Sequence, residues 1–90
     1  MEELWNSENI GFVNGNPVFR RIMQNSTTNF HTHDDSDEMF IIESGELQID
    51  FAAESLKLTK GNSFVVKAGI QHRAIAKRKV TLIVIGGHSA

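Results

Sequence analysis

Three histidines and one glutamate in this chain could together bind a metal ion: His31, His33, Glu38 and His72. In a β-strand, residues i and i+2 face the same side about 6.6 Å apart, so His31 and His33 can point toward one ion. Three imidazoles and a carboxylate are a common ligand set for iron, zinc, manganese or nickel. Taken singly, each histidine is more simply a surface or hydrogen-bonded residue, and Glu38 the last charge of an acidic loop. The hypothesis therefore depends on all four occurring together.

Short strands separated by turns must position these residues. The segment Glu46 to Phe51 alternates strictly, with its apolar side chains on one face. The expected strands are 18–23, 39–42, 46–51, 56–58, 63–67, 72–76 and 80–85, and the apolar run 39–42 is typical of a strand covered on both faces. No stretch of ten or more residues shows a helical period of about 3.6. The predicted fold class is all-β with little or no helix, a sandwich or small barrel.

Strand parity places further residues beside the candidate ligands. Glu38 faces inward if Phe40 and Ile42 do, and Ala74 and Ala76 share the face of His72. Phe40, Ala74 and Ala76 are therefore predicted to line a largely apolar cavity, since two alanines leave volume open. The alternative is that these are ordinary core residues. We favour that alternative for Ile42, and for Phe40 the two interpretations weigh equally.

Composition limits the classes of protein to which the chain can belong. Its 90 residues suffice for one small domain, 1–90, with a barrel core over about 18–85. Nine basic and eleven acidic residues give a net charge of −2, which argues against nucleic-acid binding. The basic cluster Lys77-Arg78-Lys79 lacks aromatic neighbours and is predicted to be a hairpin tip. Without cysteine, disulfides and thiolate sites are excluded.

Location and assembly are expectations from the same features. The first twelve residues are acidic where a signal peptide would be basic, and no apolar run approaches the ~20 residues of a membrane helix. We expect a cytoplasmic protein with no membrane partner. A core this small, with no disulfide, favours a homodimer.

Two motifs resemble those of the cupin family. His31-x-His33-x4-Glu38-x6-Gly45 is similar to its first motif, and Gly61-x5-Lys67-x-Gly69-x2-His72 to most of its second. The resemblance covers most of the chain. It implies a small single-domain jelly-roll β-barrel in which His31, His33, Glu38 and His72 bind one divalent transition metal per chain, of unknown identity among Fe, Zn, Mn and Ni.

The chain departs from the cupin pattern at three positions, none of them a ligand. Asn25 replaces a glycine, Lys67 replaces a proline and Ala76 replaces an asparagine. Asparagine tolerates the left-handed conformation, so the turn at Asn25 is expected to survive. Without the proline, the turn before His72 is expected to be less rigid.

The resemblance allows several functions. One is a metal-dependent enzyme, of the dioxygenase or sugar-phosphate isomerase type, acting on a small molecule in the barrel cavity. Another is a non-catalytic module that binds a metal or ligand, and a third is a barrel with a purely structural metal. No tyrosine or cysteine occurs in the chain, so catalysis would fall on the metal, its water and Glu38.

The remaining charged residues are expected to be solvated. We expect a solvated loop at the barrel mouth over Asp34-Asp35-Ser36-Asp37. One of its aspartates is a candidate to orient a ligand histidine. Arg20, Arg21 and Arg73 are predicted to face solvent, although one of them could reach an anionic substrate. His88 and the tail 86–90 are expected to be inert and mobile.

Overall fold

The computed structural model describes residues 1–87, which form nine strands and no helix. The strands are β1 (Leu4–Val13), β2 (Asn16–Gln24), β3 (Ser26–Thr27), β4 (Glu38–Ser44), β5 (Glu46–Asp50), β6 (Ser55–Thr59), β7 (Ser63–Val66), β8 (Arg73–Ala76) and β9 (Val80–Gly86). No helix in this part of the chain is long and apolar enough to span a membrane. The expectation of an all-β fold is confirmed. His88 and the end of the predicted tail lie outside the described residues.

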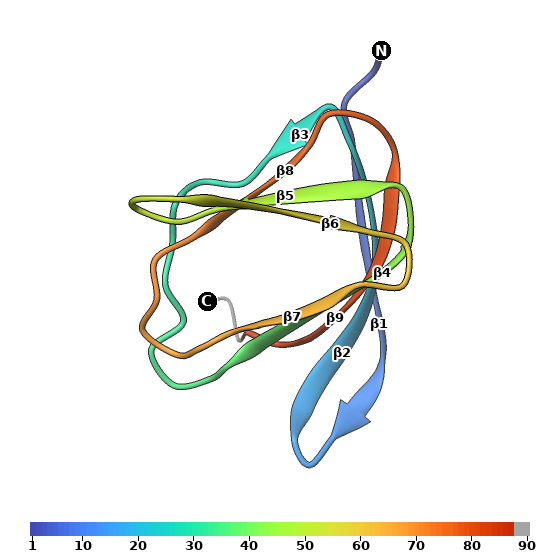
Figure 1. The fold of residues 1–90 in the computed structure, drawn as a ribbon. Coiled ribbons are helices and arrows are strands. Elements are labelled where there is room, and N and C mark those ends of the chain that lie inside the picture. Colours follow the sequence, from blue (N-terminus) through green and yellow to red (C-terminus); the bar gives the residue numbers. More distant parts are fainter. Residues whose placement is uncertain (88–90) are drawn as a thin grey trace.

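Two antiparallel sheets face each other (Figure 1). One sheet has the order β1-β2-β9-β4-β7 and the other β3-β8-β5-β6. The chain changes sheet after β2, β3, β4, β6, β7 and β8, and all strand pairs within each sheet are antiparallel, as in a jelly roll. The β1–β2 hairpin extends beyond the sandwich formed by the other strands.

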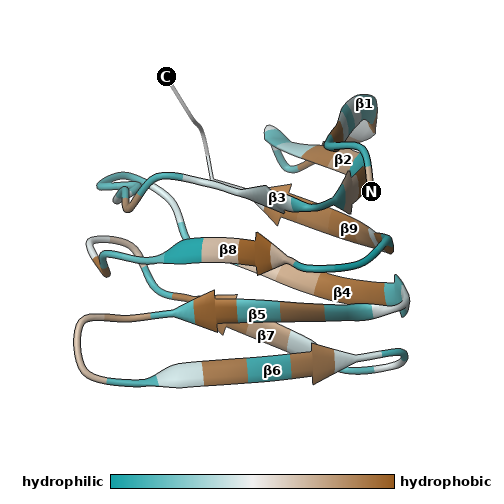
Figure 2. Cartoon of the chain, turned by 90° about the horizontal axis from the view of Figure 1, so that it is seen from above, coloured by the Kyte–Doolittle hydropathy of each residue, from teal (hydrophilic) through white to brown (hydrophobic). Residues whose placement is uncertain are grey.

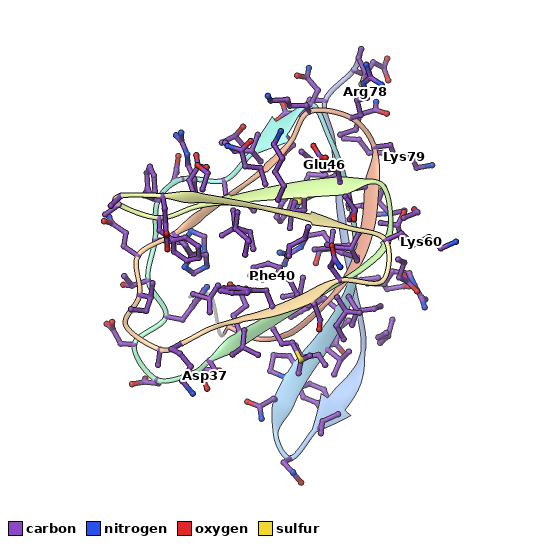
Figure 3. All side chains as sticks on the ribbon, viewed as in Figure 1. Asp37, Phe40, Glu46, Lys60, Arg78 and Lys79 are labelled. Atoms are coloured by element: carbon purple, nitrogen blue, oxygen red, sulfur yellow. The ribbon has the colours of Figure 1, made fainter. Side chains whose placement is uncertain are left out.

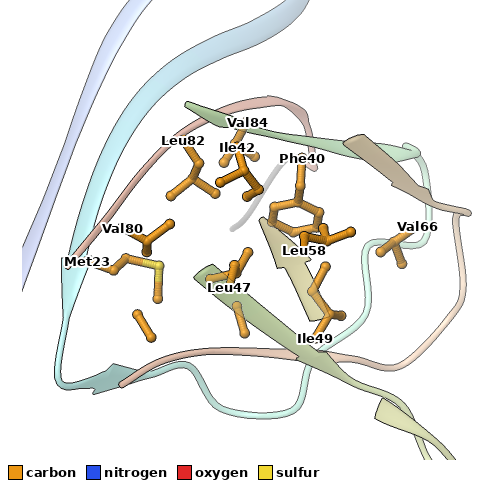
Figure 4. Packing of buried hydrophobic residues seen from close by; sticks show 12 residues of the cluster. Met23, Phe40, Ile42, Leu47, Ile49, Leu58, Val66, Val80, Leu82 and Val84 are labelled. Atoms are coloured by element: carbon orange, nitrogen blue, oxygen red, sulfur yellow. The ribbon is translucent and has the colours of Figure 1, made fainter. Parts of the chain in front are cut away.

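Alternating side chains of the central strands fill the space between the sheets. In β9, Val80, Leu82 and Val84 are at most 1% exposed, and the residues between them are half-buried. The three buried residues cluster with Phe40 and Ile42 of the neighbouring strand β4 and with Leu47 and Ile49 of β5 in the facing sheet (Figure 4). Hydrophobic positions concentrate along these strands, whereas many connections are hydrophilic (Figure 2). Burial of alternate apolar residues on both inner faces is what holds a two-sheet fold together.

The predicted strands all occur, with ends shifted by one or two residues. The run 39–42 is covered less than expected: Phe40 and Ile42 are buried, whereas Met39 and Ile41 are half-buried on the outer face. Gly86, expected in a mobile tail, is the last residue of β9.

Three features of the fold differ from the sequence-based expectations. β1 was not predicted, because nearly all its residues are exposed and it therefore shows no apolar alternation. The two-residue strand β3 is too short to give a periodic signal. The segment 77–79 is not a hairpin tip, because β8 and β9 belong to different sheets. Arg78 and Lys79 point outward from this connection (Figure 3).

Candidate metal centre

The four candidate ligands converge at one end of the sandwich. Their nearest ligand atoms all lie within 4.8 Å of one another. The Nε2 of His72 lies 2.9 Å from Oε1 of Glu38, and the Nε2 of His33 lies 3.4 Å from the same oxygen. The His31 and His72 rings are 4.4 Å apart between centroids. The structure thus brings together residues separated by up to forty-one positions in the chain.

Backbone pairing places His31 opposite His72. The two residues form an isolated antiparallel bridge, with both N–H···O distances between 2.9 and 3.0 Å. His31 and His33 do not lie in a regular strand as expected, because the segment from Thr28 to Asp37 is irregular apart from this bridge. Their rings nevertheless converge, with centroids 4.8 Å apart.

Glu38 is held at the start of β4, in the middle of its sheet. It pairs with Gly86 of β9 on one side and Val66 of β7 on the other. Its carboxylate is 6% exposed, and Gly87 packs against it so closely that a Cβ at position 87 would lie 2.6 Å from Cδ of Glu38. A buried carboxylate requires compensating partners, and here these are two imidazoles.

Main-chain carbonyls orient two of the histidines. The Nδ1 of His31 donates to the Asn29 carbonyl at 2.7 Å, and the Nδ1 of His72 donates to the Ile70 carbonyl at 2.9 Å. A carbonyl oxygen only accepts, so each Nδ1 carries the proton and Nε2 is left to bind an ion. Burial lowers the pKa of His72, but the hydrogen bonds to Glu38 and Ile70 and the Glu38 charge outweigh it and leave this pKa raised.

Main-chain carbonyls, and not the expected aspartate, orient His31 and His72, whereas Asp37 stabilises the turn before His72. Its carboxylate accepts hydrogen bonds from Nζ of Lys67 at 2.8 Å and from the Ala68 N–H at 2.9 Å. These bonds lower the pKa of Asp37. The Gly69 N–H also donates to the His33 carbonyl at 2.9 Å. The turn that lacks a proline at position 67 is therefore fixed by hydrogen bonds across the two motifs.

Asn25, another of the three departures from the cupin pattern, adopts the conformation expected of it. Its φ is +48°, in the left-handed region that a glycine would normally occupy. Its side-chain amide donates to the Met1 carbonyl at 3.0 Å. The turn between β2 and β3 therefore survives and also holds the start of the described chain.

A cavity of about 470 Å³ adjoins the four candidate ligands. Phe40 and Ala74 line it, as strand parity predicted, whereas Ala76 lies in the apolar core instead of on the cavity wall. Figure 3 shows Phe40 between the two sheets. The cavity is large enough for a small organic ligand.

The cavity has eight further lining residues that the sequence did not reveal: Trp5, Ser7, Phe19, Arg21, Thr28, Asn29, Gly86 and Gly87. Two of them belong to β1, which had no sequence signal. Arg21 did have one, because it alternates with Phe19 and Met23 on the inward face of β2. A charge at an inward strand position is the pattern that would have identified it, and the expectation that Arg21 is solvated is wrong.

The donor set fits a divalent transition metal. Ligand atoms that share an ion at about 2.1 Å lie roughly 3 to 4 Å apart, close to the spacing found here. Imidazole and carboxylate suit iron, zinc, manganese and nickel. The oriented Nε2 atoms and the buried carboxylate are what such a site requires.

Comparisons with known proteins agree with the fold and the motifs. A cupin-2 domain-containing protein from Shewanella frigidimarina superimposes with a TM-score of 0.87 at 26% identity, covering 98% of this chain and 85% of that one. Protein NMB1881 from Neisseria meningitidis gives a TM-score of 0.79, also at 26% identity, over 94% of this chain and 86% of that one.

Sequence comparison identifies the family directly. The uncharacterized protein YdbB of Bacillus subtilis is 44% identical over 45 residues, which are 49% of this chain and about 40% of the length of that relative. The family model Cupin_2, described as a cupin domain, matches residues 18–86 and so includes both motifs. The chain therefore belongs to the cupin family.

Proposed function

We propose that this protein binds one divalent transition metal through His31, His33, Glu38 and His72, and acts on a small molecule in the adjoining cavity. The observation that carries the proposal is the placement of all four donors on the wall of one cavity of about 470 Å³. A structural site is closed by protein ligands, whereas a catalytic site keeps positions open to a substrate. Four ligands facing a cavity favour the second arrangement.

Each residue of the site would have a distinct role in binding the ion or the small molecule. The three histidines hold the ion, with His31 and His72 fixed by main-chain carbonyls. Glu38 supplies the one negative charge among the donors and can accept a proton from a bound ligand. A bound ion would polarise a carbonyl or activate water, or bind dioxygen if it were iron. Phe40 and Ala74 supply apolar wall beside these donors.

Two reaction types suit such a site. Oxidation by dioxygen would require iron, whereas isomerisation of a sugar phosphate would use zinc or manganese as a Lewis acid. Metal identity therefore decides which assay comes next: oxygen consumption for iron, or aldose–ketose interconversion for zinc or manganese.

A structural metal is the second candidate, and the irregular segment 28–37 favours it. This segment carries two of the donors, and apart from the bridge at His31 it has no strand structure. An ion would tie it to β4 and β8, and metal binding would then contribute to folding free energy. Binding of azide to the loaded protein, seen as a spectral change with cobalt or iron, would show an open position and reject a closed structural site.

Metal content tests the proposal. Protein purified without chelators or nickel affinity should contain about one equivalent of metal, and Glu38→Gln should lose most of it because the one anionic donor is removed. Glu43→Gln is the matched control, since Glu43 lies on the same strand but is exposed and pairs with Arg20. Elemental analysis of the two variants and of His31→Ala/His72→Ala measures the effect. Absence of metal after reconstitution of the unsubstituted protein would refute the proposal.

We also propose that the protein is a homodimer formed through β1. This strand is ten residues long, lies at the edge of its sheet, and exposes Ile10, Phe12 and Val13. A long, apolar, unpaired edge is the kind of surface that pairs with a second chain. A second copy of the chain would cover it.

A further inference from the structure

Arg21 occupies a position where a strand of this fold would normally place an apolar residue. It lies between Phe19 and Met23 on the inner face of β2 and pairs with buried Leu82 of β9. Its side chain lines the same cavity as His31, His33, Glu38 and His72. Burial lowers the pKa of Arg21, and the charge of Glu38 opposes that effect. An arginine remains charged under such conditions, so a positive charge faces the cavity.

The guanidinium is held in place but has little to bind. Its Nε donates to Oγ of Ser7 at 3.4 Å, and its Cζ lies 4.5 Å from the ring centroid of Trp5. No other hydrogen bond or ion pair joins it to a residue in the range 1–87. Arg20 and Arg73 differ, because each pairs with a carboxylate, Glu43 and Asp50 respectively. The two terminal amino groups of Arg21 are thus left to bind a ligand.

The charges in the cavity favour an anion. A divalent ion held by one carboxylate and three neutral imidazoles keeps a net positive charge, and Arg21 adds a second. With metal bound, the site is therefore electropositive inside a largely apolar wall. A guanidinium matches a carboxylate through two parallel hydrogen bonds. The apolar part of the wall, Trp5, Phe19 and Phe40, suits a hydrocarbon or aromatic body better than a sugar.

We propose that Arg21 is the anion-binding residue of this cavity, and that the cavity takes a small organic carboxylate whose apolar body lies against Trp5, Phe19 and Phe40. This inference rests on the proposed function, because it takes the metal as bound. It adds a substrate class to that function and a residue that selects it. Arg21 is a specificity residue, and Trp5 and Ser7 are the positioning residues that hold its guanidinium.

Trp5 provides the readout. It is the only tryptophan in the chain, there is no tyrosine, and its ring lies against the guanidinium of Arg21. A carboxylate bound by Arg21 should therefore change the fluorescence of a single, identified residue. The probe is phenylacetate, a carboxylate. Phenylacetamide is its neutral counterpart, and phenyl phosphate represents the phosphate esters. Each is titrated into the metal-loaded protein.

We expect phenylacetate to bind the unsubstituted protein, and Arg21→Gln to weaken that binding at least tenfold. Arg21→Lys should weaken it less, since it keeps the charge but loses the paired geometry. Arg20→Gln is the matched control, being the neighbouring arginine on the outer face, and should leave binding unchanged. Phenylacetamide should bind weakly in every variant. Thermal unfolding shows whether each variant folds. If Arg21→Gln does not fold, the phenylacetate affinity of Arg21→Lys alone tests the inference.

The outcomes separate this inference from the proposed function. Metal content is measured first in every variant, and absence of metal from the unsubstituted protein refutes the proposed function. Equal phenylacetate affinity in loaded Arg21→Gln and unsubstituted protein would show that the ion alone binds the carboxylate, and would overturn the inference. Failure of phenylacetate to bind either protein would overturn it as well. Tighter, Arg21-dependent binding of phenyl phosphate would replace the carboxylate class with a phosphate ester.

Discussion

Gly87 lies so close to the Glu38 side chain that any side chain at position 87 would displace it. A Cβ at this position would meet the carboxylate and its neighbouring carbons, the Cγ at 2.7 Å. The Glu38 side chain would then have to leave the position in which it contacts His33 and His72. A ligand moved by a fraction of an ångström is a poorer ligand, because the donors no longer converge.

We expect Gly87→Ala to lower metal affinity about tenfold, the scale on which residues that position metal ligands usually act. Gly61→Ala, in the turn between β6 and β7, is the control: both glycines have positive φ, but nothing lies within 4 Å of a Cβ at position 61. The control measures backbone strain alone, so it should lower the melting temperature with little effect on the metal. Competition with a chromogenic chelator gives both affinities. Equal losses in the two variants would mean that strain, and not contact with Glu38, is responsible.

Asp50 ties three strands of the second sheet at the end of β5. Its carboxylate accepts hydrogen bonds from Gln48 and Ser55, both at 2.7 Å, and from Nε of Arg73 in β8 at 2.9 Å. These bonds lower its pKa from 3.8 to about 2. Because β8 follows directly on His72, the same contacts hold one metal ligand in register with the sheet.

The lowered pKa predicts how stability depends on acid. The folded state binds the proton of Asp50 less readily than the unfolded state, so its stabilisation is complete above pH 3.8 and is lost as the pH falls to about 2. Asp50→Asn should be less stable at neutral pH and show a smaller decline in melting temperature over that interval. Glu54→Gln, at an exposed position in the same hairpin, should behave as the unsubstituted protein does. Calorimetry between pH 2 and pH 5 gives the comparison, and parallel curves for Asp50→Asn and the unsubstituted protein would contradict it.

The sequence predicted those elements whose two faces differ in environment. β5 and β9 alternate because one face is buried, so their limits were predictable to within about a residue. β1 is exposed along nearly its whole length, and no pattern distinguishes such a strand from a loop. The candidate ligands were found because three histidines and a glutamate are uncommon at motif spacing. The walls that β1 supplies could not be found, since nothing local indicates that Trp5 faces the cavity.

The exposed surface of β1 is the feature of the whole molecule on which the proposed dimer rests. Phe12 is 70% exposed on the hairpin that extends beyond the sandwich (Figure 1). At the opposite edge of the same sheet, β7 has only four residues and Val65 is 41% exposed. The two edges therefore offer a direct comparison of a long apolar edge with a short one.

We expect sedimentation velocity to give a dimer at micromolar concentration. Phe12→Glu should shift it to monomer, because the substitution places a charge on the apolar edge, whereas Val65→Glu should leave it dimeric. A monomer for the unsubstituted protein at that concentration would rule the dimer out. A shift to monomer caused by Val65→Glu alone would place the interface on β7 instead.

One part of the cavity wall comes from a different segment of the chain than the four candidate metal ligands. All four donors lie within residues 18–86, which the family model matches, whereas Trp5 and Ser7 lie in β1, before that match begins. Replacement of β1 can thus reshape the pocket and reposition Arg21 while every donor stays where it is. The ten-residue strand β1 can therefore vary in sequence, and with it this part of the cavity wall, without any change in the residues of the candidate metal centre.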